Sequence, residues 1–158
     1  MAGIRPVHDF LTVAAAAPLQ EAGVVALGLP EDFYERQADE YRERRNLLMA
    51  ILADTGFEAK APEGAYYVMA DISHLGFTDD VEAATRLVED AGVAVVPGSS
   101  FFSRPELGRH IVRFAFCKKL ETLEEAGRRL RAFVGQGVRR SPRAKEPLAG
   151  LTARSSRR

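Results

Sequence analysis

HIVRFAF, residues 110–116, is the stretch that decides the fold. It has the composition of a β-strand, and the side chains of a strand alternate between its two faces. Val112, Phe114 and Phe116 therefore share one face, which by composition faces a core. Arg113 stands on the opposite face, and no carboxylate within the strand can neutralise it. The stretch predicts a sheet with one core face and leaves a charge on the other face to be explained.

The segments around this strand alternate between helical and extended patterns. Helices are expected over 18–27, 31–53, 78–91 and 122–134, and strands over 57–60, 65–72, 93–96 and 110–116. One sheet with helices to cover it is a two-layer α/β sandwich, here with a small mixed or antiparallel sheet.

The ends of two helices carry capping signals. Thr78 is the expected N-cap of the helix that Gly92 stops, and Thr122 with Glu125 is the expected capping box of the last helix. The residues expected to face inward from the helix after Thr78 are Val81, Leu87, Val88 and Ala91.

Length and cysteine content place the chain in a broad class. At 158 residues it is long enough for one domain with tails. The single cysteine, Cys117, excludes an internal disulfide framework and fits a reducing compartment. No apolar run approaches the ~20 residues of a membrane-spanning helix. We expect a cytoplasmic protein with no membrane partner.

Charge is unevenly distributed along the chain. Residues 136–158 hold seven basic residues and one glutamate, which gives +6; because the whole chain is neutral, residues 1–135 carry −6. An acidic body argues against nucleic-acid binding. The basic tail, rich in Ser, Pro and Arg, is expected to be a disordered, solvated extension.

Few residues could carry out chemistry unaided. His8, His74 and His110 stand in no metal-ligand spacing, and no phosphate-cradling glycine motif is present. The two serines of PGSSF lack the pattern of a nucleophile elbow. We therefore expect no catalytic residue, metal ligand or cofactor ligand on this chain.

Arg113 allows two interpretations. It could be a strand arginine that reaches a surface carboxylate, or a clamp for the carboxylate of a ligand, because a guanidinium matches a carboxylate bidentately. Its modest neighbours Ile111 and Ala115 leave room for a ligand, and the loop at 97–102 precedes it in the chain. The residues alone leave both interpretations open.

Four segments, in this order and at these spacings, resemble the C-terminal part of a class I/II pyridoxal-phosphate aminotransferase of fold type I. They are VHDFLTVAAAAPLQEAG, PEGAYYVMADI, GVAVVPGSSFF and VRFAFCKKLETLEEAGRRL. The resemblance runs from about Ile4 to Leu130. It points to the branch that contains aspartate, methionine and kynurenine aminotransferases.

The resemblance implies roles for individual residues. Arg113 would hold the α-carboxylate of the substrate, and Tyr66 would line the substrate pocket. The loop that contains Gly98 and Ser99 would border the mouth of that pocket. These four residues are the expected substrate-binding residues.

The resemblance also implies a domain organisation. Residues 31–135 would form the small C-terminal domain, with the long helix along the edge of its sheet. Residues 1–30 would pack on the larger domain of the family, and 136–158 would be the basic tail.

The implied activity is amino-group transfer from an L-amino acid to a 2-oxo acid with pyridoxal 5'-phosphate, in a homodimeric full-length protein. The family's Schiff-base lysine and most phosphate ligands belong to the larger domain, and none of Lys60, Lys118, Lys119 and Lys145 stands in its motif. We therefore expect a C-terminal fragment that contributes the carboxylate clamp and has no activity by itself. The alternative is a catalytically inactive aminotransferase-like fragment that acts as a binding or interaction module.

Overall fold

The computed structural model describes residues 3–12 and 14–136, so the expected basic tail and Lys145 lie outside the described residues. Its helices are α1 (Ile4–Thr12), α2 (Ala17–Leu27), α3 (Glu31–Asp54), α4 (Asp80–Glu89) and α5 (Leu120–Gly135). Its strands are β1 (Glu58–Ala59), β2 (Tyr67–Asp71), β3 (Val96–Pro97) and β4 (Ile111–Ala115). Two 3-10 turns, η1 (Gly98–Phe101) and η2 (Pro105–Gly108), lie between β3 and β4.

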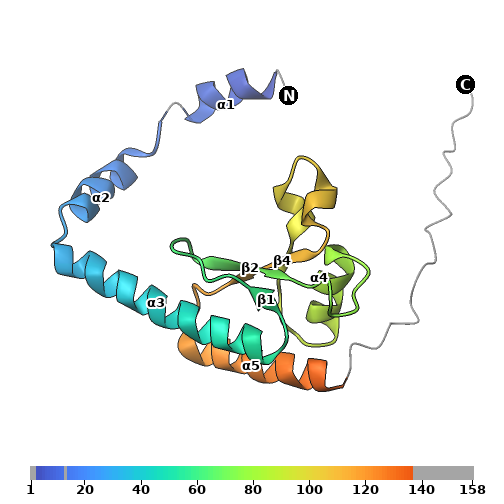
Figure 1. Ribbon diagram of the computed structural model, residues 1–158. Helices are drawn as coiled ribbons and strands as arrows, with labels where there is room; N and C mark the ends of the chain where they lie inside the picture. The colour runs from blue at the N-terminus through green and yellow to red at the C-terminus, as the bar shows by residue number, and fades with distance from the viewer. Residues whose placement is uncertain (1–2, 13, 137–158) are drawn as a thin grey trace, which may run out of the picture. The chain divides into compact units, whose positions relative to one another are not determined.

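The four strands form one sheet in the order β1-β2-β4-β3, with antiparallel pairing throughout (Figure 1). The predicted α/β sandwich is confirmed, and of the two expected kinds of sheet the antiparallel one is found. Both edge strands are two residues long, which leaves few unpaired backbone groups at the edges. The strand expected over 93–96 is the shorter β3, Val96–Pro97.

One face of the sheet is the core face, as the alternation in β4 predicts. Val112, Phe114 and Phe116 are all buried, and Phe57 packs edge-to-face on Phe114 with ring centroids 5.2 Å apart. Helices α3, α4 and α5 contribute apolar residues to the same cluster, namely Leu48, Ile51, Leu52, Ala83, Leu87, Leu123, Leu130 and Phe133.

The C-terminal part of α3 lies beside α5 on this core face (Figure 1). Asp54 near the end of α3 forms an ion pair with Arg131 of α5. The expectation that the long helix runs along the edge of the sheet is wrong. Leu48, Ile51 and Leu52 form a buried stripe on α3, and such a stripe has to pack against the core.

Helix α4 begins one residue later than expected. Asp79 is its N-cap, and the Asp79 carboxylate accepts a hydrogen bond from the Glu82 N–H at 2.8 Å. Thr78 lies outside the helix and donates its backbone N–H to the Glu82 carboxylate. The expected Thr78 cap is therefore wrong; the adjacent aspartate is an equally good or better capping residue.

The inward face of α4 also differs from expectation. Leu87 is fully buried and Ala91 partly buried, but Val81 and Val88 are 54% and 50% exposed. These two valines are seven residues apart and so lie on one side of the helix, away from the stripe that contains Ala83 and Leu87. Helical geometry selects the alanines for the core in their place.

The capping box expected at the start of α5 is absent. The helix begins at Leu120 with Lys119 as N-cap, so Thr122 already lies in its first turn. The Lys119 carbonyl accepts the first helical bonds, and the Glu125 carboxylate pairs with arginines at 128 and 129 further along the helix.

The chain divides into two compact units at the step from Glu40 to Tyr41. In the first unit, α1 was not expected from the sequence, whereas α2 was. The Tyr34 hydroxyl donates a hydrogen bond to the Ala26 carbonyl, which ties the start of α3 to α2. No side chain of α2 is buried. Within residues 3–12 and 14–136, no helix combines the length and apolarity needed to cross a membrane.

Candidate functional site

Arg113 lies in the middle of β4 on the face of the sheet opposite the helices, as the strand alternation predicts. Its neighbours Val112 and Phe114 are buried, whereas Arg113 is only partly buried. Its guanidinium carbon Cζ lies 5.0 Å from the ring centroid of Tyr67 and 4.5 Å from that of Phe101. Both distances fall within the range of cation–π attraction. Two aromatic rings therefore fix the position of the guanidinium.

The guanidinium of Arg113 has no hydrogen-bond partner among the residues that the structure describes. Its Nε atom is buried and has no hydrogen-bond partner among residues 3–12 and 14–136. Within the same residues we find no ion pair of Arg113 with a carboxylate. A buried donor without a partner costs about 1–3 kcal/mol, so such an atom calls for an explanation. The interpretation of Arg113 as an arginine that reaches a surface carboxylate therefore lacks support, because no carboxylate in the described part of the chain pairs with it.

Arg86 offers an internal comparison. Its Cζ also lies over two rings, at 5.6 Å from Phe77 and 5.5 Å from Phe133. It is only 8% exposed, however, and its Nε pairs with the Asp90 carboxylate at 3.2 Å. Its Nη1 is buried without a partner among the described residues, as Nε of Arg113 is. The difference is therefore the carboxylate: Arg86 has one, and Arg113 has none in the described part of the chain.

Tyr67, and not Tyr66, contacts Arg113. Tyr66 is 49% exposed and packs edge-to-face on Tyr67, with ring centroids 5.5 Å apart. In β2 the buried residues are Val68 and Ala70, so Tyr67 and Met69 share the outer face with Arg113. This alternation was readable from the sequence and could have identified Tyr67. The substrate-pocket role of Tyr66 stays a prediction.

The loop between β3 and β4 supplies the second ring. Gly98 is buried, and a Cβ built on it would lie 2.5 Å from the Ile111 carbonyl oxygen and 2.7 Å from that of Gly108. The Ser99 backbone N–H donates to the Asp80 carboxylate at 2.7 Å. The loop that contains Gly98 and Ser99 thus contacts Arg113 through the Phe101 ring. The sequence placed Phe101 in this loop but assigned it no role.

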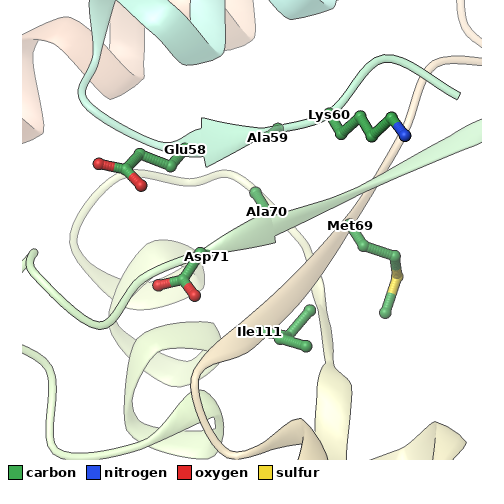
Figure 2. Close-up of a pocket in the computed structure, with 7 residues that line it drawn as sticks. All are labelled: Glu58, Ala59, Lys60, Met69, Ala70, Asp71 and Ile111. Carbon is green, nitrogen blue, oxygen red and sulfur yellow. The ribbon is translucent and has the colours of Figure 1, made fainter.

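A shallow pocket lies on the same outer face toward the β1 edge (Figure 2). Glu58 and Asp71 are directly opposite each other in the β1–β2 register and lie at one end of it. Lys60 and Met69 lie at the other end. The pocket has two carboxylates and one ammonium group, so its charge does not favour a dianionic ligand.

Asp71 is held in its charged form. Hydrogen bonds from the Ser73 side chain and backbone N–H, the latter at 2.7 Å, keep the pKa of the Asp71 carboxyl below its ordinary value. Partial burial opposes this shift, and the nearby imidazoles of His74 and His110 add to it. Asp71 acts as a local turn cap at the end of β2.

Comparison with known proteins gives the family. A family model described as "Aminotransferase class I and II" matches residues 2–130. A probable N-succinyldiaminopimelate aminotransferase of Mycobacterium tuberculosis is 35% identical over 138 residues, which cover 82% of this chain and 35% of that protein. The methionine aminotransferase of Escherichia coli is 35% identical over 130 residues, which cover 82% of this chain and 33% of that protein.

A solved structure supports the same relationship. The N-succinyldiaminopimelate aminotransferase from Mycobacterium tuberculosis matches with a TM-score of 0.72 and 37% identity, over 83% of this chain and 34% of that one. The chain thus spans about a third of the length of the relatives that it matches. The chain belongs to the class I and II aminotransferase family.

Proposed function

We propose that this chain supplies the carboxylate-binding arginine of an aminotransferase that moves an amino group from an L-amino acid to a 2-oxo acid. The observation that carries the proposal is Arg113: a guanidinium held by two rings on the open face of the sheet, with no carboxylate partner in the described residues. Family membership supplies the reaction class.

Arg113 would act through its outer end. Because Nε is buried, a ligand carboxylate can approach the two terminal nitrogens, Nη1 and Nη2. These nitrogens form a planar pair whose N–H groups donate to both carboxylate oxygens at once. An amino acid and a 2-oxo acid each carry a carboxylate next to the reacting carbon, so one arginine serves both half-reactions of a ping-pong transfer.

Pyridoxal phosphate supplies the electron sink of such a transfer when it is bound. The described lysines do not fit its attachment. Lys60 shares a pocket with two carboxylates, which would repel the cofactor's phosphate, Lys118 lines a pocket on the helix side, and Lys119 is the N-cap of α5. We therefore derive no step of the reaction through the cofactor on this chain.

The organisation of the whole protein belongs to the same proposal. We propose that residues 31–135 act as the small domain and residues 1–30 contact a larger domain, in a cytoplasmic homodimer. Support comes from the relatives, of whose length this chain spans a third. Tyr66, Gly98 and Ser99 are proposed to border the substrate beside Arg113.

The test joins this chain to the part of an aminotransferase that it does not span. Residues 4–135 replace the matched region of the Escherichia coli methionine aminotransferase, and amino transfer to a 2-oxo acid is measured. Arg113→Ala should weaken binding of both substrates by ~2–5 kcal/mol, the cost of removing one partner of a buried charge pair. Arg113→Lys should recover only part of this loss, because an ammonium cannot bind bidentately.

Arg104→Ala is the matched control, since it removes the same charge from an exposed arginine that pairs with Glu106 in the neighbouring loop. Transfer by this variant should equal that of the unsubstituted chimera. Unchanged turnover and unchanged KM values for both substrates in Arg113→Ala would show that the clamp assignment is wrong.

A second candidate is a non-catalytic module that binds a carboxylate or a partner chain. What supports it is that Arg113 and its two rings lie on this chain, so binding of a carboxylate without transfer needs only the described residues. A folded chimera that binds a 2-oxo acid through Arg113 but transfers no amino group would support this candidate over the first.

A further inference from the structure

Asp80 is a buried carboxylate that meets the candidate site at the Ser99 N–H and has been given no role above. It lies in the first turn of α4 and is 3% exposed. Its Oδ2 atom accepts the Ser99 backbone N–H at 2.7 Å, across 19 residues of chain. A carboxylate is buried at a high cost unless it is hydrogen-bonded, and a bond to a charged acceptor is stronger than one between neutral groups. The contact is therefore a strong local restraint on the loop that contains Ser99.

The restrained loop is the one that carries Phe101. Ser99 and Phe101 belong to the same 3-10 turn, η1, and the Ser99 carbonyl accepts the Phe102 N–H at 3.4 Å. The other side of the turn is packed against backbone, because a Cβ built on Gly108 would lie 2.4 Å from the Gly98 carbonyl carbon. A turn held on both sides has little freedom to move the Phe101 ring.

The Phe101 ring in turn contacts the guanidinium of Arg113 at 4.5 Å. A continuous series of contacts thus leads from Asp80 through the Ser99 N–H and η1 to Arg113. Within the described residues we find no hydrogen bond or ion pair between Asp80 and Arg113, so Asp80 can act on the arginine only through the turn.

We propose that Asp80 is a positioning residue for Arg113: its carboxylate holds η1 so that Phe101 stays on the guanidinium and keeps Nη1 and Nη2 aimed at a ligand carboxylate. The part of this inference that concerns ligand binding rests on the proposed function. The part that concerns the position of Arg113 does not, and the two can be measured separately.

The position of the Arg113 guanidinium is measured by NMR, from the chemical shift of its Nε–H proton in the full 158-residue chain without any ligand. Protons above an aromatic ring are shielded, so this resonance should lie upfield of those of exposed arginines, and Phe101→Leu should move it downfield. Asp80→Ala should move it in the same direction as Phe101→Leu. Asp80→Asn keeps an oxygen that can accept the Ser99 N–H, so it should restore most of the shift.

Asp79→Ala is the matched control, because it removes the neighbouring carboxylate and the N-cap of the same helix. A general weakening of α4 would move the Arg113 resonance equally in Asp79→Ala and Asp80→Ala, and that result would overturn the proposal. If Asp80→Ala does not fold, Asp80→Asn decides. The neutral amide is a weaker acceptor than the carboxylate, so a small downfield movement of the Arg113 resonance together with a movement of the Ser99 amide resonance supports the proposal, and any other outcome overturns it.

Ligand binding is then measured by titrating each variant with pyruvate. Asp80→Ala should weaken the apparent affinity about 2- to 30-fold, the range for residues that act through a network of contacts, with Asp80→Asn in between and Asp79→Ala unchanged. If the unsubstituted chain binds no pyruvate, the proposed function fails while the resonance test still decides the role of Asp80. An unchanged affinity for pyruvate in a variant whose Arg113 resonance has moved would show that Asp80 does not aim the guanidinium at a ligand.

Discussion

At the scale of single residues, Arg113 and Arg86 differ in the partner of the guanidinium, and this difference motivates the proposed binding role of Arg113. Both contact two rings, but within the described part of the chain only Arg86 has a carboxylate, Asp90, in hydrogen-bond range. The alternation of a strand was sufficient to predict the face of Arg113. It could not predict Phe101, because no periodicity links a loop residue to a strand residue twelve positions later; that contact comes from the packing of η1 on the sheet.

Asp71 gives a pH-dependent prediction at the same scale. Its pKa is lowered from an ordinary value of 3.8, first of all by the Ser73 side chain. A carboxyl with a lowered folded-state pKa adds stability above its unfolded-state pKa, and this stability is lost as the pH falls through the folded-state value. Ser73→Ala should therefore raise the pKa of Asp71 toward 3.8.

The measurement is a carbon-13 titration of the Asp71 carboxyl by NMR between neutral pH and pH about 2, the interval in which carboxyl groups protonate. Asp71→Asn should make the acid limb of the unfolding free energy shallower. Ser103→Ala, at an exposed loop position, is the control. A pKa for Asp71 that is equal in the unsubstituted chain and in Ser73→Ala would contradict the assigned cause.

At the scale of elements, the helices and strands were predictable and their ends were not. The periodicity of α2, α3 and α4 identified each helix to within about two residues, which is the usual uncertainty of helix ends. The caps of α4 and α5 were misplaced, because Thr78 stands beside Asp79 and Thr122 lies within the first turn of α5. Each helix start has several neighbouring residues that could act as its N-cap, and tertiary packing decides which of them does.

The caps of α4 yield a stability prediction. Asp79→Ala should lower the free energy of unfolding by about 1 kcal/mol, since it removes the acceptor of the Glu82 N–H. Thr78→Ala should have little effect, because only the backbone N–H of Thr78 is bonded in the described structure. Urea denaturation of the two variants compares them directly. An equal loss of unfolding free energy in the two variants, or a larger loss in Thr78→Ala, would contradict Asp79 as the N-cap and favour Thr78.

At the scale of the whole molecule, the fold class followed from composition and pattern, because a half-apolar strand requires helices on one face only. Because residues 1–30 are expected to pack on a larger domain, the sequence also predicts exposed apolar surface in the first unit. Its large side chains are mostly in water: Ile4, Val7, Phe10, Leu11, Leu19, Val24, Val25 and Leu27 are each 59% to 88% exposed. Surfaces of this kind in soluble proteins mark binding faces.

We therefore expect the chain to associate with itself and to bind a dye for exposed apolar surface. Phe10→Ser combined with Leu27→Ser should reduce both properties, because these two side chains are 88% and 85% exposed. Val81→Ser, at a position 54% exposed in the second unit, should change neither. Sedimentation over a range of concentrations checks the prediction. A monomer at every concentration with no dye bound would contradict it.

The central claim, that Arg113 binds the carboxylate of a small ligand, is tested most directly by calorimetric titration of the 158-residue chain with pyruvate and with pyruvamide, which has no carboxylate. The account predicts saturable binding of pyruvate, none of pyruvamide, and a loss of ~2–5 kcal/mol in Arg113→Ala with partial recovery in Arg113→Lys. Arg104→Ala should bind as the unsubstituted chain does. Equal affinity for pyruvate in Arg113→Ala and in the unsubstituted chain would contradict the account.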